Sequence, residues 1–231
     1  YKLICENSVL DAFGNTLALE VPFNAESKPL NKKQQNIDFE GLDANALPGG
    51  FSESTGWSGA EFSYTAHDEG QAVKLTKSNV AAGTHLYFIN DISSINNKKG
   101  KLTYSLDMYL HSKNTAPNMR AMINGGFYLF TKSDSTGALT YDNKTQIGTL
   151  KKDDWNNLKF VFDYAAKEIK YYANEAHIKT ISFDEVVPYS GTTKFDGNFT
   201  RLDFITYIAA TQTSSLYFDN INASYEEIVP T

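Results

Sequence analysis

Hydrophobic and polar positions alternate along much of this chain, most regularly over residues 154–183. Leu158, Phe160 and Phe162 occupy every second position there, and a period of two places apolar side chains on one face of a β-strand. The pattern predicts strands over 158–163, 169–173 and 178–183, joined by a turn at 165–168 and a tight reversal at Asn174-Glu175. We therefore expect an antiparallel meander in this stretch.

Short apolar segments separated by Gly, Asn and Asp recur through the rest of the chain, and no segment of ten or more residues has a convincing 3.6-residue period. The further expected strands span residues 61–66, 72–76, 85–89, 102–111, 119–123, 127–131, 202–208 and 216–225. Many short strands with such turns predict an all-β antiparallel sandwich, not a parallel sheet with crossover helices.

Three motifs carry a resemblance to known domains. Trp155 opens the meander, and Asn174 stands at its second turn. The segments D-F-E-G at 38–41 and L-Y-F-D-N-I-N-A-S at 216–224 lie near the two ends of the same region. Together they resemble concanavalin A-like and laminin G-like jelly-roll domains, similar to the carbohydrate-binding modules of bacterial surface or secreted proteins. The resemblance implies a jelly-roll sandwich that recognises sugars, with Trp155 packed in its core.

The same resemblance implies a structural calcium ion held by an acid of the first strand and an Asp of the last. Here those positions are Glu40 and Asp219. Calcium takes about six to eight oxygen ligands, so backbone carbonyls would have to complete the shell. The alternative is that both acids bind only backbone groups at the ends of strands.

The first residues differ from the rest of the chain. Two short apolar segments, 1–5 and 17–21, flank the turn D-x-x-G-N-T at 11–16, which is similar to the last hairpin of bacterial immunoglobulin-like domains. Residues 1–24 are thus expected to form a hairpin, either the end of a preceding module or an edge of the sandwich. The polar segment 25–36 is expected to be a linker, and residues 37–231 the jelly-roll domain.

Composition excludes some partners. The chain has 231 residues and a formal net charge of −6, and its lysines form no run longer than two, so we expect neither nucleic-acid binding nor attraction to anionic membranes. No apolar run approaches the roughly 20 residues of a membrane helix. A single cysteine and an abundance of Asn, Ser, Thr and Tyr are typical of bacterial secreted and surface proteins. With no initial Met or signal peptide, the chain is expected to be a mature or excised piece of a multidomain protein.

Catalytic signatures of this fold are weak. Neither the E-x-D-x-E strand of jelly-roll glucanases nor the R-x-E-x-R strand of polysaccharide lyases occurs. The nearest acidic pairs, Asp38 with Glu40 and Asp184 with Glu185, suit a strand end and a turn. The sequence therefore favours a protein without catalytic activity, and an enzyme whose acids come from separate strands is the alternative.

Binding chemistry gathers on the strand over 102–111, where every even position is apolar except for the Tyr104 hydroxyl. Asp107, Tyr109 and His111 share the other face, and sugars suit such hydroxyl-, acid- and ring-bearing surfaces. Arg120 on the following strand could donate two hydrogen bonds to a carboxylated or hydroxyl-rich sugar. The alternative is an ordinary solvated sheet face.

Two more aromatic residues complete the candidate set. By the same alternation, Tyr207 points away from the apolar face of its strand, and Trp57 stands in the small-residue loop S-T-G-W-S-G. Trp57 could stack on a sugar ring, or it could cap the sandwich edge. The sequence thus predicts a non-catalytic glycan-binding module of a secreted or cell-surface multidomain protein. A polysaccharide lyase or hydrolase, and an adhesive protein-binding domain, are the alternatives.

Overall fold

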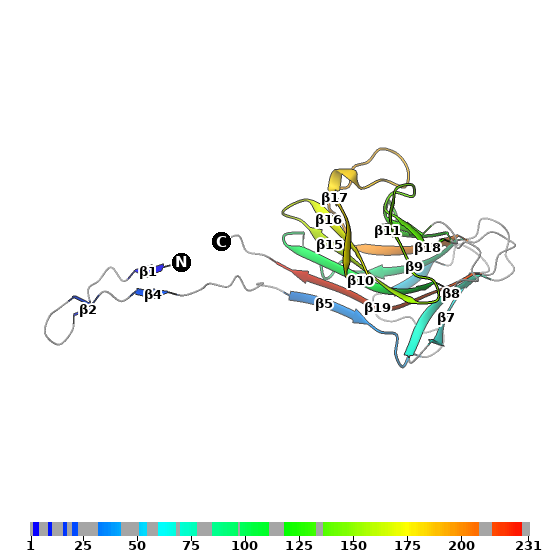
Figure 1. Ribbon diagram of the computed structural model, residues 1–231, viewed down its shortest axis with the longest axis horizontal. Helices are drawn as coiled ribbons and strands as arrows, with labels where there is room; N and C mark the ends of the chain where they lie inside the picture. The colour runs from blue at the N-terminus through cyan, green and yellow to red at the C-terminus, as the bar shows by residue number, and fades with distance from the viewer. Residues whose placement is uncertain are drawn as a thin grey trace.

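The computed structural model describes residues 2–4, 9–10, 16–17, 20–22, 32–42, 51–54, 60–67, 70–77, 85–96, 98–110, 118–132, 136–207 and 214–227. Near the N-terminus, β1 (Lys2–Ile4) pairs with β4 (Glu20–Pro22), and β2 (Val9–Leu10) pairs with β3 (Thr16–Leu17). Among the described strands, these four pair only with one another (Figure 1). The expected hairpin is therefore present, and its origin in a preceding module stays a prediction.

Two large antiparallel sheets form the rest of the molecule (Figure 1). The first contains, in spatial order, β17 (Ala176–Ser182), β16 (Glu168–Ala173), β15 (Trp155–Asp163), β10 (Lys101–Leu110), β19 (Ser214–Glu226), β8 (Gly70–Lys77) and β7 (Ala60–His67), with β5 (Lys32–Ile37) also paired to β19. The second contains β14 (Gln146–Thr149), β13 (Ala138–Thr140), β12 (Phe127–Lys132), β11 (Asn118–Ile123), β18 (Arg201–Tyr207), β9 (His85–Asp91) and β6 (Phe51–Ser54).

This architecture confirms the predicted jelly-roll β-sandwich. The only helix in the described ranges is the short 3₁₀ turn η1 (Phe183–Glu185). The meander forms as expected, and its second turn is the predicted reversal at Asn174 and Glu175, whose φ angles are 49° and 68°. Positive φ at both central residues gives a turn whose twist matches that of the flanking strands.

Aromatic rings from the two sheets meet in the core. Phe130 of β12 stacks on Phe160 of β15 with ring centroids 5.2 Å apart, and Phe204 of β18 meets Phe218 of β19 at 4.9 Å. All four rings are buried. Each such side chain contributes about 1.5–3 kcal/mol when removed from water, so these pairs are a main source of attraction between the layers.

Two expectations for this region were wrong. The last five residues of the expected linker form most of β5, because the backbone from Lys32 to Ile37 pairs with the free edge of β19. The side chains of Lys33, Gln34 and Asn36 are exposed, and that of Gln35 is partly buried. Trp155 does not pack in the core. Asn156 takes the buried position at this end of β15, where its side chain bonds the backbone N and O of Lys151. Trp155 is therefore on the outer face.

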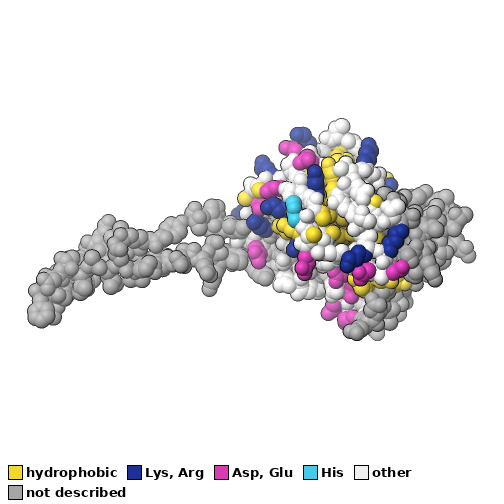
Figure 2. All heavy atoms as spheres, viewed as in Figure 1, with side chains coloured by type: hydrophobic (Ala, Val, Ile, Leu, Met, Phe, Trp, Pro, Cys, Tyr) yellow, Lys and Arg dark blue, Asp and Glu magenta, His cyan; other side chains and the backbone are white. Residues whose placement is uncertain are grey.

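Charges of both signs are interspersed over the face seen in Figure 2, with no continuous basic area there. The part of the chain that the structure describes contains no helix long and apolar enough to cross a membrane.

Candidate functional site

The predicted binding residues of β10 lie on the outer face of the eight-stranded sheet, and their groups are already engaged. Asp107 accepts hydrogen bonds from the side-chain amides of Asn157 at 2.8 Å and Asn220 at 2.9 Å. Tyr109 lies edge-on between Trp155, at 5.6 Å, and Tyr217, at 5.9 Å. These contacts hold three neighbouring strands together, and a role of Asp107 and Tyr109 in binding stays a prediction.

The structure does not bring the other predicted residues to the same face. Arg120 is on β11 and the backbone of Tyr207 pairs with that strand at Asn118, so both belong to the seven-stranded sheet. The expectation that Arg120 joins Asp107 on one surface was wrong, because the chain crosses to the opposite layer between β10 and β11. Trp57, His111 and the side chain of Tyr207 lie outside the described residues.

The two acids expected to hold calcium both bind backbone amides. Glu40 Oε1 accepts from the N–H of Gln71 at 2.7 Å, and Asp219 Oδ1 accepts from the N–H of Asn220 at 2.7 Å. Burial raises the pKa of Asp219 to about 6, and the carboxylates of Asp107 and Glu40 add to this rise. In the described ranges, no group of three or more His, Cys, Asp or Glu side chains is placed to hold a metal ion. The side chains alone therefore do not form a calcium site, and the ion stays a prediction.

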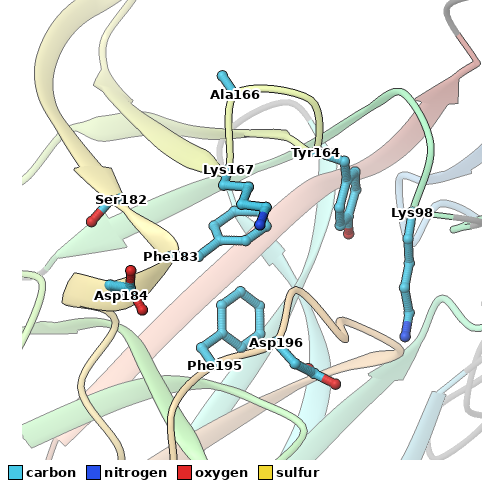
Figure 3. Close-up of a pocket in the computed structure, with 9 residues that line it drawn as sticks. All are labelled: Lys98, Tyr164, Ala166, Lys167, Ser182, Phe183, Asp184, Phe195 and Asp196. Atoms are coloured by element: carbon cyan, nitrogen blue, oxygen red, sulfur yellow. The ribbon is translucent and has the colours of Figure 1, made fainter.

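A hollow of about 550 Å³ lies where several turns meet at one end of the sandwich (Figure 3). Its volume is typical of small-molecule sites, which span about 300–1,000 Å³. The lining side chains come from the turn before β10, the β15–β16 turn, η1 and the loop that follows η1. They are Lys98, Tyr164, Ala166, Lys167, Ser182, Phe183, Asp184, Phe195 and Asp196. We call this hollow the end pocket.

Aromatic rings form one side of the end pocket. Phe183 meets Tyr164 at 5.8 Å and Phe195 at 5.2 Å between ring centroids, in edge-to-face geometry. Phe195 in turn meets Phe127 of β12 at 5.3 Å. Phe183 and Phe195 are largely buried, so this wall is continuous with the core and is held rigidly by it.

Local geometry fixes Phe183 in this wall. At the start of η1, Glu185 Oε2 accepts hydrogen bonds from the backbone N and the Oγ of Ser182, at 2.7 and 3.0 Å. These two bonds lower the pKa of Glu185, which stays ionised as a cap. Gly197 has φ of +85°, and a Cβ there would lie 3.0 Å from the Phe183 ring. Glycine thus allows the loop after η1 to pass close to that ring.

Positively and negatively charged side chains surround the aromatic wall. Lys98 and Lys167 come from different turns, and neither ammonium forms an ion pair within the described part of the chain. In the view of Figure 3 the Tyr164 ring lies between these two side chains, with Asp196 across the hollow. Asp184 is exposed and forms an ion pair with Lys194 at 3.2 Å.

Tyr164 adds a hydroxyl that stays protonated. Burial raises its pKa above the ordinary value, and the oxygen accepts a hydrogen bond from the Asn96 side-chain amide at 2.5 Å. The end pocket therefore combines aromatic carbon with ammonium donors, a phenol and carboxylate acceptors. Such a site suits an uncharged, hydroxyl-rich ligand, whose hydroxyls donate as well as accept.

Sequence reasoning missed the end pocket. Its residues come from four separate segments and form no local motif, and Asp184 was noticed only as a neighbour of Glu185. That Lys98 and Lys167 line the same hollow depends on the order of strands in the sheets, which the periodicity does not give.

Comparisons with known proteins identify the fold and no family. No family model matches the chain, and no curated protein matches it. Solved structures do match. A sialidase is 12% identical with a TM-score of 0.56, over 84% of this chain and 18% of that chain. A conserved carbohydrate esterase, vb_24B_21, from the Shiga toxin-encoding bacteriophage phi24B is 17% identical with a TM-score of 0.51, over 77% and 90%.

A third structure, the cellulose induced protein Cip1, is 15% identical with a TM-score of 0.50, over 85% of this chain and 99% of that chain. This chain thus spans 18% of the length of the sialidase and most of the length of the other two proteins. At these identities the likeness shows a shared β-sandwich fold.

Proposed function

We propose that this chain is a non-catalytic carbohydrate-binding module of a secreted or cell-surface multidomain protein, and that the end pocket binds the saccharide. The observation that carries the proposal is the composition of this pocket. An aromatic wall, a phenol, two carboxylates and two ammonium groups that form no ion pair with the described residues surround one hollow of about 550 Å³.

Saccharides match this combination for two physical reasons. A pyranose has apolar C–H faces that pack on aromatic rings, and the partly exposed Tyr164 ring lines the hollow beside the largely buried Phe183 and Phe195. Its hydroxyls each donate and accept hydrogen bonds, and Lys98 and Asp196 offer one partner of each kind. The names of the sialidase, the carbohydrate esterase and the cellulose induced protein point in the same direction.

The presence of two carboxylates, Asp184 and Asp196, in one pocket favours glycoside hydrolysis as the second candidate. A catalytic acid is usually kept protonated by an apolar surround. Asp184 is instead exposed and paired with Lys194, and Asp196 Oδ1 accepts the N–H of Asn198 at 2.8 Å. These environments favour binding over acid catalysis.

A glycan array combined with product analysis tests the proposal. We expect retention of one class of saccharide, loss of that retention in Lys98→Gln/Lys167→Gln, and retention unchanged in Lys152→Gln, whose exposed side chain is outside the pocket. Neither new reducing ends nor unsaturated uronates should appear when the retained glycan is incubated with the protein. Release of either product would favour the enzyme, and retention of no glycan would refute the proposal.

A further inference from the structure

Among the residues that the structure describes, the guanidinium of Arg120 has no anionic partner. Its Nε is buried and forms no hydrogen bond, and it is the only nitrogen of this side chain that is both buried and without a partner. The described residues form no ion pair with Arg120, and its guanidinium carbon lies 5.5 Å from the centre of the Tyr189 ring. A partly buried cation without a counter-charge is costly, and an anion at its outer nitrogens would offset that cost.

Tyr189 is half exposed, at 50%, and it is the only large hydrophobic side chain in the described ranges that is so exposed. Its position is fixed by backbone hydrogen bonds. The N–H of Tyr189 donates to the carbonyl of Gly126 at 2.8 Å, and the N–H of Tyr128 donates to the carbonyl of Val187 at 2.9 Å. The Tyr128 ring meets the Tyr189 ring edge-on at 5.9 Å. The exposed ring is therefore held in place before any ligand arrives.

Tyr128 and Tyr189 line a hollow of about 300 Å³ between the turn at 142–144 and the segment 187–188. We call it the Tyr189 hollow. It lies beside the seven-stranded sheet and shares no lining residue with the end pocket.

The charges around the Tyr189 hollow favour an anion. Lys144 is exposed and forms no ion pair among the described residues. Asp142 is the one carboxylate in the lining, and its oxygens are occupied by the N–H of Lys144 at 2.9 Å and by the N–H and Oγ of Thr145 at 2.5 and 2.8 Å. Burial opposes ionisation of Asp142, but these hydrogen bonds outweigh it and lower the pKa. One satisfied carboxylate and Lys144 thus line the hollow, and Arg120, which is not a lining residue, lies next to it against the Tyr189 ring.

We propose that the Tyr189 hollow binds the carboxylate-bearing residue of an acidic saccharide. Arg120 would bind the carboxylate through its outer nitrogens, since a guanidinium and a carboxylate are planar and match as a fork. Tyr189 would pack on the C–H face of the same sugar, and Lys144 would supply the second cation. The inference rests on the proposed function, because it takes the ligand to be a saccharide. It adds a second site, which distinguishes acidic from neutral saccharides.

Isothermal titration with a matched pair of ligands tests it, using the complete chain. The pair is tri-galacturonic acid and its methyl ester, which share the same sugar chain and differ in the carboxylate charges and the ester methyl groups that replace them. In the unsubstituted protein we expect the acid to bind about tenfold tighter than the ester, the effect of a charge-assisted hydrogen-bonded contact. Arg120→Gln should reduce this ratio to about one, and Lys144→Gln should reduce it in part.

Matched variants separate the roles. Tyr189→Ala should weaken the acid and the ester alike, because the ring contacts the sugar and not its charge, whereas Lys152→Gln should change neither. Lys144 is exposed and forms no ion pair with the described residues, so its variant tests the proposal even if Arg120→Gln alters folding. An acid-to-ester ratio near one in the unsubstituted protein, or a ratio that Lys144→Gln leaves unchanged, would overturn the proposal.

Two further comparisons identify the chemical class of the ligand and show whether a negative result affects this inference alone or also the proposed function. A sulfated galactan that binds as tightly as the acid would contradict the carboxylate assignment. Acetate that competes at the same concentration as the acid would contradict the assignment of a saccharide, because acetate has the carboxylate without the sugar. If neutral saccharides bind in a way that depends on Lys98 and Lys167 while the acid binds no tighter than its methyl ester, only this inference fails. If no saccharide binds at all, the proposed function fails with it.

Discussion

The hydroxyl of Tyr104 donates a hydrogen bond of 2.9 Å to Oδ1 of Asn90, across the core from β10 to β9. Both side chains are fully buried, and Asn90 in turn donates to the side-chain carbonyl of Gln35 on β5 at 3.1 Å. This polar chain links the two sheets at one register, because a shift of either strand would leave buried groups without partners.

Tyr104→Phe should lower the free energy of unfolding by about 1–3 kcal/mol, since it leaves the buried Asn90 oxygen unsatisfied. Urea denaturation measures the change. Tyr172→Phe is the matched control, because Tyr172 is only half buried and its hydroxyl forms no hydrogen bond with the described residues. Equal stability of the two variants would contradict the role given to Tyr104.

Asp219 should make stability depend on pH. Its pKa is about 6 in the folded chain against an ordinary value of 3.8, so the folded state binds the proton more strongly and stability falls as the pH rises from about 4 to about 6. Asp219→Asn removes this loss. We expect the variant to be more stable than the unsubstituted protein at pH 8 by about 1 kcal/mol, allowing for solvent screening of a half-exposed group. Near pH 3.5 the two proteins should be equally stable. Urea denaturation at pH 8 and at pH 3.5 measures both differences in stability.

The calcium prediction can be tested at the same residue. If Glu40 and Asp219 contribute to a calcium site with backbone carbonyls, millimolar calcium should raise the melting temperature at pH 7.5, and magnesium should not. Glu40→Gln and Asp219→Asn should each abolish that rise. A rise that persists in both variants would place the ion elsewhere, and no rise would remove calcium from the account.

Gly197 and Gly191 form a matched pair for the end pocket. Both have positive φ, +85° and +77°, but a Cβ at Gly197 would press on Phe183 whereas one at Gly191 would meet nothing within 4 Å. Each Gly→Ala change should cost about 1 kcal/mol through the backbone. Gly197→Ala should cost more and should also weaken saccharide binding, because Phe183 must move. Equal effects on stability and binding would contradict the packing described for the pocket wall.

Much of the fold could be predicted from periodicity. The alternation of Leu158, Phe160 and Phe162 is read directly as burial of one face, and the strands expected at 61–66, 72–76 and 127–131 all form. Alternation fails where a strand has no apolar face. β5 is polar except for Ile37 at its end, and it is a strand because β19 offers an unpaired edge, which depends on tertiary structure.

The sites could be predicted only in part. Arg120 was noticed for its chemistry, but its placement opposite to Asp107 follows from strand order, and no local pattern reports strand order. The end pocket depends on turns that meet in space, and Lys98 and Lys167 are separated in the sequence by six strands, β10 to β15. Trp155 shows the reverse error. The resemblance to jelly-roll domains implied a core position for Trp155, whereas the hydrogen-bonding capacity of Asn156 decided which side chain is buried.

The most direct test of the account is a titration of the isotope-labelled chain with neutral oligosaccharides of glucan, xylan, mannan and galactan types, followed by two-dimensional NMR. For the type that binds, the largest shifts should map to the turns carrying Lys98, Lys167 and Phe195, and Lys98→Gln/Lys167→Gln should weaken the affinity about tenfold while the spectrum remains that of a folded protein. Shifts confined to the outer face of β10, around Asp107 and Tyr109, or the absence of shifts with every saccharide, would contradict the assignment of sugar binding to the end pocket.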